Sequence, residues 1–319
     1  MMKLDPTIVY DTYWYFATER QSVFFNKIQN KRESTADPIL QNYKFTNAYR
    51  ASDRVSQYLI KNVIYNGDQT SEEIFFRILL FKIFNKISTW EYLTREYGRI
   101  SFSEYSFKHY DNSLNRLMNR GVKIYSAAYM MPSGKSLFGF DRKHQNHLKL
   151  IELLMNDNVS NKITELKSMQ KVFLLLRSYP MLGNFLAYQY AVDLNYSALT
   201  NFSEMDFVVA GPGAINGIAK CFNNYAGLTE TDIIKIVADK QEEEFQKRRL
   251  DFKTLWGRRL HLIDCQNLFC EVDKYSRVAF PDIKGVNNRI KIKQKYKPNI
   301  EPIIYWYPPK WNINHLIEV

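Results

Sequence analysis

The chain has 319 residues, of which 45% are hydrophobic and 24% are charged, and this composition excludes a disordered or collagen-like protein. Its formal net charge of +11 favours a polyanionic partner, with nucleic acid as the leading class. Aromatic residues make up 15% of the chain, and aromatic faces among basic side chains are what stacking on exposed bases requires. A core rich in Phe and Tyr is the alternative explanation.

The cysteines and the apolar segments indicate the cellular setting. Three cysteines in a chain of this length predict neither a disulfide framework nor a zinc site, and they favour a reducing compartment. Asp5 and Asp11 precede any long apolar run, which argues against a signal peptide. The longest apolar stretch, Val172–Val192, is interrupted by Arg177 and Pro180. We expect a cytoplasmic protein with no membrane partner, no metal and no cofactor, and no obligate protein partner is indicated.

Glycine and proline are scarce, and apolar residues recur at helical spacing, so the sequence predicts an all-α fold with minor β elements. The predicted helices are, in chain order, Asp11–Ile28, Asn47–Ile64, Ser71–Tyr97, Arg142–Met155, Lys162–Arg177, Leu182–Leu194, Glu230–Arg249 and Phe252–Cys270. Strand-like segments are Val122–Tyr129 and Asn288–Lys297. We divide the chain into an N-terminal helical lobe, 1–120, a second helical lobe, 121–280, and a basic, aromatic extension, 281–319.

A conspicuous local feature lies between residues 207 and 220, where two glycines flank a proline. We predict that a helix over 202–210 ends there, that Gly211 and Gly213 form a tight hairpin, and that a second helix begins near Ala214. The amide groups at the start of that helix point outward and can bind a phosphate. The pattern resembles the helix-hairpin-helix of DNA repair glycosylases. Alternatively, the glycines serve only the packing of two helices.

A second feature gathers carboxylates and cations between Leu262 and Val278. In the glycosylases that the hairpin resembles, an aspartate element follows, and Val272–Val278 looks similar to it. This resemblance implies a carboxylate beneath the sugar, where it stabilises oxocarbenium character during base release. The candidate catalytic residues are Asp273, Glu271 and Lys274. The alternative is a salt-bridged cluster that fixes the helix.

The segment Lys44–Asn62 is dense in Asn, Arg, Asp and Gln, which are the residue types that read base edges and clamp phosphates. A solvated helix face is the ordinary explanation of such a polar stripe. We interpret it instead as the lining of a base pocket, formed by Asn47, Arg50, Asp53, Arg54 and Gln57 together with Glu19.

Basic and other residues alternate from Arg289 to Lys297. On a strand, this period of two would place the positive charges on one face as a row of phosphate contacts. A solvated edge strand protected by lysines is the alternative. The predicted DNA-binding residues are Gly211, Gly213, Lys220, Arg277, Lys291, Lys293 and Lys295.

Four segments together carry a resemblance to one family: Tyr10–Gln21, Asp37–Leu59, Gly211–Gly213 and Cys270–Tyr275. They resemble the alpha-glutamyl/putrescinyl thymine pyrophosphorylase family, which includes the helical domain of 5-hydroxymethyluracil DNA kinases, over about residues 8–280. The resemblance implies action on hypermodified pyrimidines in phage DNA. It also implies a likeness to anti-phage DNA glycosylases, and hence a two-lobed, glycosylase-like helical fold with double-stranded DNA carrying modified bases as its partner.

From these features we predict a DNA glycosylase that flips a hypermodified pyrimidine, such as glucosylated hydroxymethylcytosine, out of phage DNA and excises it, leaving an abasic site. One alternative is a transferase that acts on activated hydroxymethyluracil. Another is a sensor of modified DNA without catalytic activity. A kinase acting through this chain alone is not expected, because Tyr129 stands where the phosphate-binding loop ending at Ser133–Ser136 needs a glycine.

Overall fold

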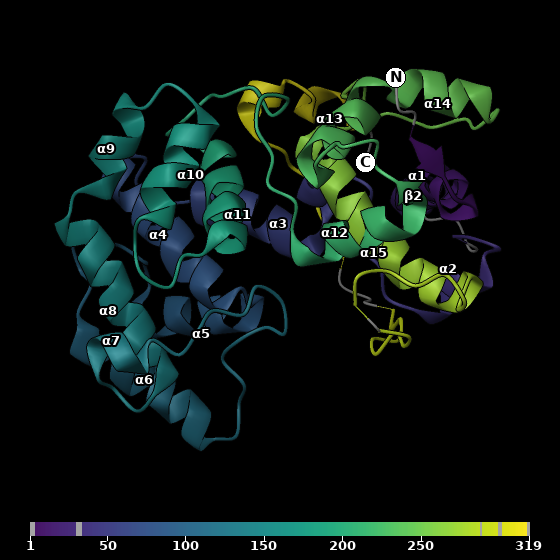
Figure 1. Cartoon of the computed structure of the whole chain (residues 1–319). Helices are drawn as coiled ribbons and strands as arrows, with labels where there is room; N and C mark the ends of the chain where they lie inside the picture. Colours follow the sequence, from purple (N-terminus) through teal and green to yellow (C-terminus); the bar gives the residue numbers. More distant parts are fainter. Residues whose placement is uncertain (1–3, 30–33, 288, 299–301, 318–319) are drawn as a thin grey trace. The chain divides into compact units, whose positions relative to one another are not determined.

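The computed structural model describes residues 4–29, 34–287, 289–298 and 302–317. α-Helices dominate these residues (Figure 1). The named strands in them are β1, Asp5–Pro6, and β2, Phe222–Asn224, which pair antiparallel. The predicted mostly α class with minor β elements is confirmed. No helix in the described ranges is long and apolar enough to cross a membrane.

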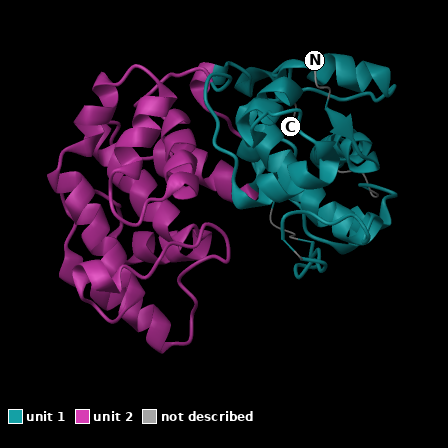
Figure 2. Cartoon of the chain, viewed as in Figure 1, with its two compact units in different colours: residues 1–53, 204–305, 311–319 teal, residues 54–203, 306–310 magenta. Residues whose placement is uncertain are grey.

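The chain folds into two compact units, which Figure 2 distinguishes by colour. Unit 1 comprises residues 1–53, 204–305 and 311–319, and unit 2 comprises residues 54–203 and 306–310. Both units are discontinuous in sequence, whereas the lobes predicted from the sequence are continuous segments. Contacts between residues far apart along the chain define the units, and local patterns do not encode such contacts.

Unit 2 is built around α4, whose residues from Glu73 to Phe84 are all buried, the charged Glu73, Arg77 and Lys82 among them. The predicted helix over 71–97 is divided, because Asn85 ends α4 in the left-handed conformation at φ 47°. The helical elements of the unit are α3 (Arg54–Tyr58), a π-helix (Leu59–Ile64), α4 (Ser71–Phe84), α5 (Ile87–Tyr97), α6 (Phe107–Asn119), α7 (Lys135–Phe138), α8 (Lys143–Asn156), α9 (Val159–Glu165), α10 (Met169–Arg177) and α11 (Asn184–Asn195).

Unit 1 is built around the contact between α12 and α15. Its helices are α1 (Ile8–Ile28), α2 (Pro38–Asn42), a 3-10 turn (Arg50–Ser52), α12 (Pro212–Cys221), α13 (Glu230–Asp239), α14 (Gln241–Lys247) and α15 (Leu262–Ala279). A Cβ atom at Gly217 of α12 would lie 2.0 Å from the carbonyl oxygen of Phe269 in α15. Only glycine therefore permits the two helix backbones to approach this closely.

The predicted helix-hairpin-helix is not formed. Residues 202–211 contain no helix, and α12 begins at Pro212 with Gly211 as its N-cap. The Asn195 side chain instead holds the preceding loop, accepting a hydrogen bond from the Phe202 amide at 2.9 Å. Gly213 lies inside α12, where an added Cβ would be 2.9 Å from the Cys270 sulfur. The packing role that we considered for these glycines therefore accounts for the geometry at Gly213 and Gly217.

Three other predicted elements differ from the structure. The helix predicted from Phe252 begins only at Leu262, because positive φ angles at Trp256 and Gly257 turn the chain before it. The segment over 122–129 forms no strand. In the second predicted strand, Asn288 lies outside the described residues, and 289–297 are extended with one bridge, from Lys295 to Tyr43. The remaining predicted helices are present, some of them divided in two.

Candidate functional site

Helix α15 carries several of the buried polar side chains of unit 1. Its first turn is fixed by Asp264, whose carboxylate accepts a hydrogen bond from the His261 amide at 3.0 Å. Towards its C-terminal half the helix presents Glu271 and Asp273 to different elements of the unit. Both side chains are buried, and each is held by a different set of partners.

The carboxylate of Asp273 is the centre of a buried ion cluster. Lys220 of α12 places its Nζ 3.1 Å from Asp273 Oδ1, and these side chains are 3% and 2% exposed. Arg277, one turn further along α15, pairs with Oδ2 of Asp273. The side-chain nitrogen of Asn216 donates a hydrogen bond to Oδ1. Both oxygens of Asp273 are therefore engaged in joining α12 to α15. The alternative to a catalytic role was a salt-bridged cluster of this helix with Lys274 and Arg277. The structure contains such a cluster on Asp273, with Arg277 as expected and with Lys220 instead of Lys274.

Glu271 and Lys274 hold the loop before the 3-10 turn. Glu271 Oε2 accepts a hydrogen bond from the Thr46 amide at 3.0 Å, and Lys274 Nζ lies 2.6 Å from the same oxygen. Asn267, one turn earlier, donates to the Thr46 hydroxyl at 2.9 Å. Glu271 therefore acts on this loop as a positioning residue.

Asn47 in this loop lies beside Asp53, which directly follows the 3-10 turn, and we call residues 46–53 the polar loop. The Asn47 amide donates to Asp53 Oδ1 at 2.8 Å, and its side-chain nitrogen donates to the Ser52 carbonyl at 2.7 Å. Arg20 of α1 donates to the Asn47 side chain at 2.7 Å and to the Thr46 carbonyl at 2.8 Å. The sequence-based interpretation selected the neighbouring Glu19 rather than Arg20. A buried arginine facing a polar loop could be recognised only once the loop's position was known.

Of the other predicted pocket residues, Arg50 lies near Asp53, whereas Glu19, Arg54 and Gln57 have separate surroundings. Arg50 is buried, and its amide donates to Asp264 Oδ1 at 2.8 Å. Glu19 accepts a hydrogen bond from the Thr35 hydroxyl. Arg54 and Gln57 belong to unit 2, where Gln57 Oε1 accepts from the Trp306 amide at 2.7 Å. The structure thus groups Asn47, Arg50 and Asp53 in one polar region of unit 1.

Asp53 has an unusual protonation equilibrium. Burial raises its pKa from the ordinary value of 3.8 to about 7, with the nearby Glu271 charge adding to the effect and the Asn47 amide, Arg20 and Arg50 opposing it. At a pH between 3.8 and about 7, the Asp53 carboxyl is therefore deprotonated in the unfolded chain but still protonated in the folded chain. Stability therefore falls as the pH rises from about 4 to about 7, by up to about 1.4 kcal/mol per pH unit.

We predict that Asp53→Asn removes this loss, because the neutral amide needs no proton and its oxygen still accepts from the Asn47 amide. Urea denaturation at intervals between pH 4 and pH 8 measures it. The free energy of unfolding of the variant should exceed that of the wild type progressively as the pH approaches 7. Asp239→Asn, at an exposed position, is the control and should follow the wild-type curve. Parallel curves for Asp53→Asn and the wild type would contradict the raised pKa.

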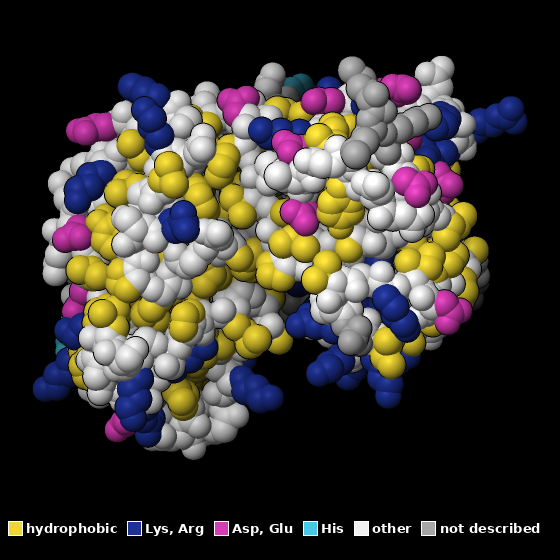
Figure 3. All heavy atoms as spheres, viewed as in Figure 1, with side chains coloured by type: hydrophobic (Ala, Val, Ile, Leu, Met, Phe, Trp, Pro, Cys, Tyr) yellow, Lys and Arg dark blue, Asp and Glu magenta, His cyan; other side chains and the backbone are white. Residues whose placement is uncertain are grey.

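The basic segment after α15 is extended and exposed. Lys291, Lys293 and Lys295 are all exposed, but Gln294 between them and the flanking Ile290 and Tyr296 are exposed as well, so the alternation does not separate two faces. Backbone hydrogen bonds from Lys44 to Gln294 and from Tyr296 to Asn42 attach the segment to unit 1. Figure 3 shows lysine and arginine side chains gathered on unit 1 near this segment. The predicted phosphate contacts are thus available to a ligand, without forming a strand.

Sequence reasoning missed several polar residues around α15. Asn216 is fully buried and bonds both Asp273 and, at 2.8 Å, the Asn287 amide. Lys284 and Arg289 lie beside Lys220 and Arg277, although they follow α15 in the sequence. The sequence shows that both residues belong to a basic tail. It does not show that they lie beside Lys220 of α12. In the described part of the chain, no group of three His, Cys, Asp or Glu side chains is arranged to hold a metal ion.

A search of curated proteins gives a relative with a stated activity. The chain is 26% identical over 286 residues to the 5-hmdU DNA kinase of Bacillus phage SP10, a match that covers 84% of this chain and 45% of the relative. The chain thus spans less than half the length of that relative. A kinase is a transferase, so the prediction of a DNA N-glycosylase, a hydrolase, is wrong.

The resemblance read from the sequence motifs is confirmed for the helical-domain family. Residues 7–285 match the family model described as the helical domain of 5-hmdU DNA kinase. No solved structure gives a significant match. Because the family match extends over most of the chain, the chain belongs to the family of 5-hmdU DNA kinase helical domains.

Proposed function

We propose that this chain binds DNA containing 5-hydroxymethyluracil and holds the modified base for group transfer at its hydroxymethyl substituent. The family match over residues 7–285, with a relative named a 5-hmdU DNA kinase, carries this proposal. The net charge of +11 and the exposed lysines after α15 support a polyanionic partner. Lys291, Lys293 and Lys295 are accordingly proposed as phosphate contacts.

In a kinase step, the hydroxymethyl oxygen attacks the γ-phosphorus of a nucleoside triphosphate, loses its proton, and displaces the nucleoside diphosphate. The segment 133–136 does not supply a phosphate-binding loop, since Tyr129 stands at the first glycine position, the described residues 120–133 form no strand before it, and Lys135 pairs with Asp141 at 2.6 Å. We therefore assign to this chain the recognition of the modified DNA rather than the binding of the triphosphate.

The polar loop of unit 1 is the proposed base-reading element. Asn47, Arg50 and Asp53 carry amide, guanidinium and carboxyl groups of the kinds that hydrogen-bond base edges. The Asn47 side chain bonds Arg20 and Ser52 within the protein, so in this proposal a base replaces these partners on binding. Glu271 and Lys274 position this loop through Thr46, as described above. Asp273 joins α12 to α15 and has no oxygen free of a partner. In this proposal it therefore supports the site rather than contacting the base.

The proposal is tested with three duplexes of one sequence that differ at a single position: thymine, 5-hydroxymethyluracil, or 5-hydroxymethylcytosine. We expect at least tenfold tighter binding of the 5-hydroxymethyluracil duplex by fluorescence anisotropy at fixed salt. Asn47→Ala should reduce this preference, because it removes a polar group of the loop, whereas Lys235→Gln on the exposed surface of α13 should leave it unchanged. Equal affinity for all three duplexes would overturn the proposal. Mass spectrometry of the recovered nucleosides, with and without a triphosphate, shows whether the chain also transfers a group.

A further inference from the structure

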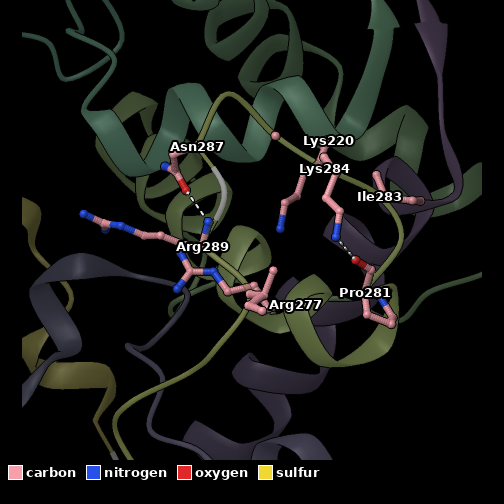
Figure 4. A pocket seen from close by; sticks show the side chains of 9 residues that line it. Lys220, Arg277, Pro281, Ile283, Lys284, Asn287 and Arg289 are labelled. Carbon is pink, nitrogen blue, oxygen red and sulfur yellow. Dashed lines mark hydrogen bonds between the residues drawn. The ribbon is translucent and has the colours of Figure 1, made fainter.

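Four of the nine residues that line a small pocket of unit 1 are cations, and none is acidic. Lys220 comes from α12, Arg277 from α15, and Lys284 and Arg289 from the segment that follows α15. Figure 4 shows these side chains lining the pocket: Lys284 Nζ turns to the Pro281 carbonyl, Arg289 extends away from the two lysines, and Asn287 bonds the Arg289 amide. The family relationship does not by itself account for this convergence of cations.

The charges in the pocket are not balanced by acidic side chains. Asp273 pairs with Lys220 and Arg277, which leaves that cluster of three with a net positive charge. Lys284 and Arg289 add two further positive charges, and in the described part of the chain neither of them pairs with a carboxylate. Among the described residues, Lys284 Nζ donates to the Pro281 carbonyl alone, at 2.9 Å. The pocket therefore attracts an anion that carries more than one negative charge.

Arg277 has a donor that no described residue uses. Its side chain is 9% exposed, and its terminal nitrogens bond Asp273 and, at 3.2 Å, the Lys291 carbonyl. Its Nε is buried and has no hydrogen-bond partner among the described residues. Because a buried unsatisfied donor costs about 1–3 kcal/mol, an unpartnered guanidinium nitrogen in a cationic pocket points to a ligand oxygen.

The wall of the pocket is held firmly in place. Asn216 of α12 accepts a hydrogen bond from the Asn287 amide at 2.8 Å and donates to Asp273. A Cβ atom at Gly285 would lie 2.4 Å from the Asn216 side-chain oxygen, so glycine lets the segment lie against α12. The Asn287 side chain in turn accepts from the Arg289 amide at 3.2 Å. The geometry is thus set before a ligand binds.

We propose that this pocket binds a phosphate group, with Lys284, Arg289 and the Arg277 Nε as direct contacts and Lys220 behind them. Guanidinium and ammonium groups converging on one space are the ordinary means of phosphate recognition. The group can come from a phosphate monoester or from the DNA backbone, which share this chemistry. The inference does not depend on recognition of 5-hydroxymethyluracil, because phosphate binding can be measured without DNA.

The test uses inorganic phosphate as the probe and isothermal titration calorimetry of the whole chain. We expect saturable binding that Lys284→Gln combined with Arg289→Gln weakens at least tenfold. The matched control, Lys235→Gln with Lys247→Gln, removes the same charge from exposed positions on α13 and α14 and should leave the affinity within twofold. The pocket assignment is overturned if phosphate does not bind, or if both double variants lose affinity equally.

Competition distinguishes the two sources of the phosphate. If the pocket takes a backbone phosphate, an unmodified duplex should displace inorganic phosphate from the wild type. If it takes a monoester, only a duplex with a phosphorylated hydroxymethyl group should do so. If the protein binds phosphate in this pocket but binds 5-hydroxymethyluracil and thymine duplexes equally, the pocket assignment stands and the proposed function is wrong. The two proposals can therefore fail independently.

Discussion

Gly217→Ala is expected to destabilise the protein by about 3 kcal/mol or more. The added methyl group would lie 2.0 Å from the Phe269 carbonyl oxygen and 2.8 Å from its carbon, and neither backbone atom can move without shifting α15. The two central helices of unit 1 must therefore separate, and they lose packing along their whole contact. At about 2–4 °C per kcal/mol, the melting temperature should fall by about 6 °C or more.

The matched control is Gly183→Ala at the N-cap of α11. Nothing lies within 4 Å of the added Cβ there, and the backbone has an ordinary φ of −69°. Its cost should be about 1 kcal/mol or less. Differential scanning calorimetry of both variants and of the wild type measures the effect. If the Gly217→Ala and Gly183→Ala proteins have the same melting temperature, α12 and α15 do not approach as closely as described.

Asp273→Ala should destabilise the protein by about 3–5 kcal/mol, because it leaves Lys220 and Arg277 buried without their counter-charge. Adding Lys220→Met to this variant should recover part of the loss, since it removes one of the uncompensated charges. The exposed pair Lys135–Asp141 offers the control: Asp141→Ala should leave the melting temperature unchanged, because the Asp141 side chain is 86% exposed.

Urea denaturation of these variants separates a structural role of Asp273 from a chemical one. A purely chemical role predicts that Asp273→Ala unfolds at the same urea concentration as the wild type. The ion cluster predicts a large shift for Asp273→Ala and a smaller one for the double variant. An unchanged midpoint would therefore contradict the assignment of Asp273 to the joint between α12 and α15.

The sequence by itself determined the features that depend on short-range spacing. Helices α1, α8 and α11 were predicted within a few residues of their bounds, because apolar residues at helical spacing and few Gly or Pro residues act within one or two turns. The four segments Tyr10–Gln21, Asp37–Leu59, Gly211–Gly213 and Cys270–Tyr275 together also carried the family resemblance, which the family match confirms. The predicted reaction was wrong because the same motifs were interpreted through a hairpin that the chain does not form.

Only the tertiary structure decided which polar groups meet. Lys220 and Asp273 are separated by 53 residues, and Arg20 reaches Asn47 across 27, so no periodic pattern encodes either contact. A helix over 202–210 was predicted from the hairpin pattern, yet the Asn195 side chain and Pro212 at the start of α12 fix a different path. Helical spacing reflects local backbone hydrogen bonding, whereas the partner of a buried charge depends on which distant helices pack together. The cationic pocket could therefore be recognised only once α12, α15 and the following segment were in place.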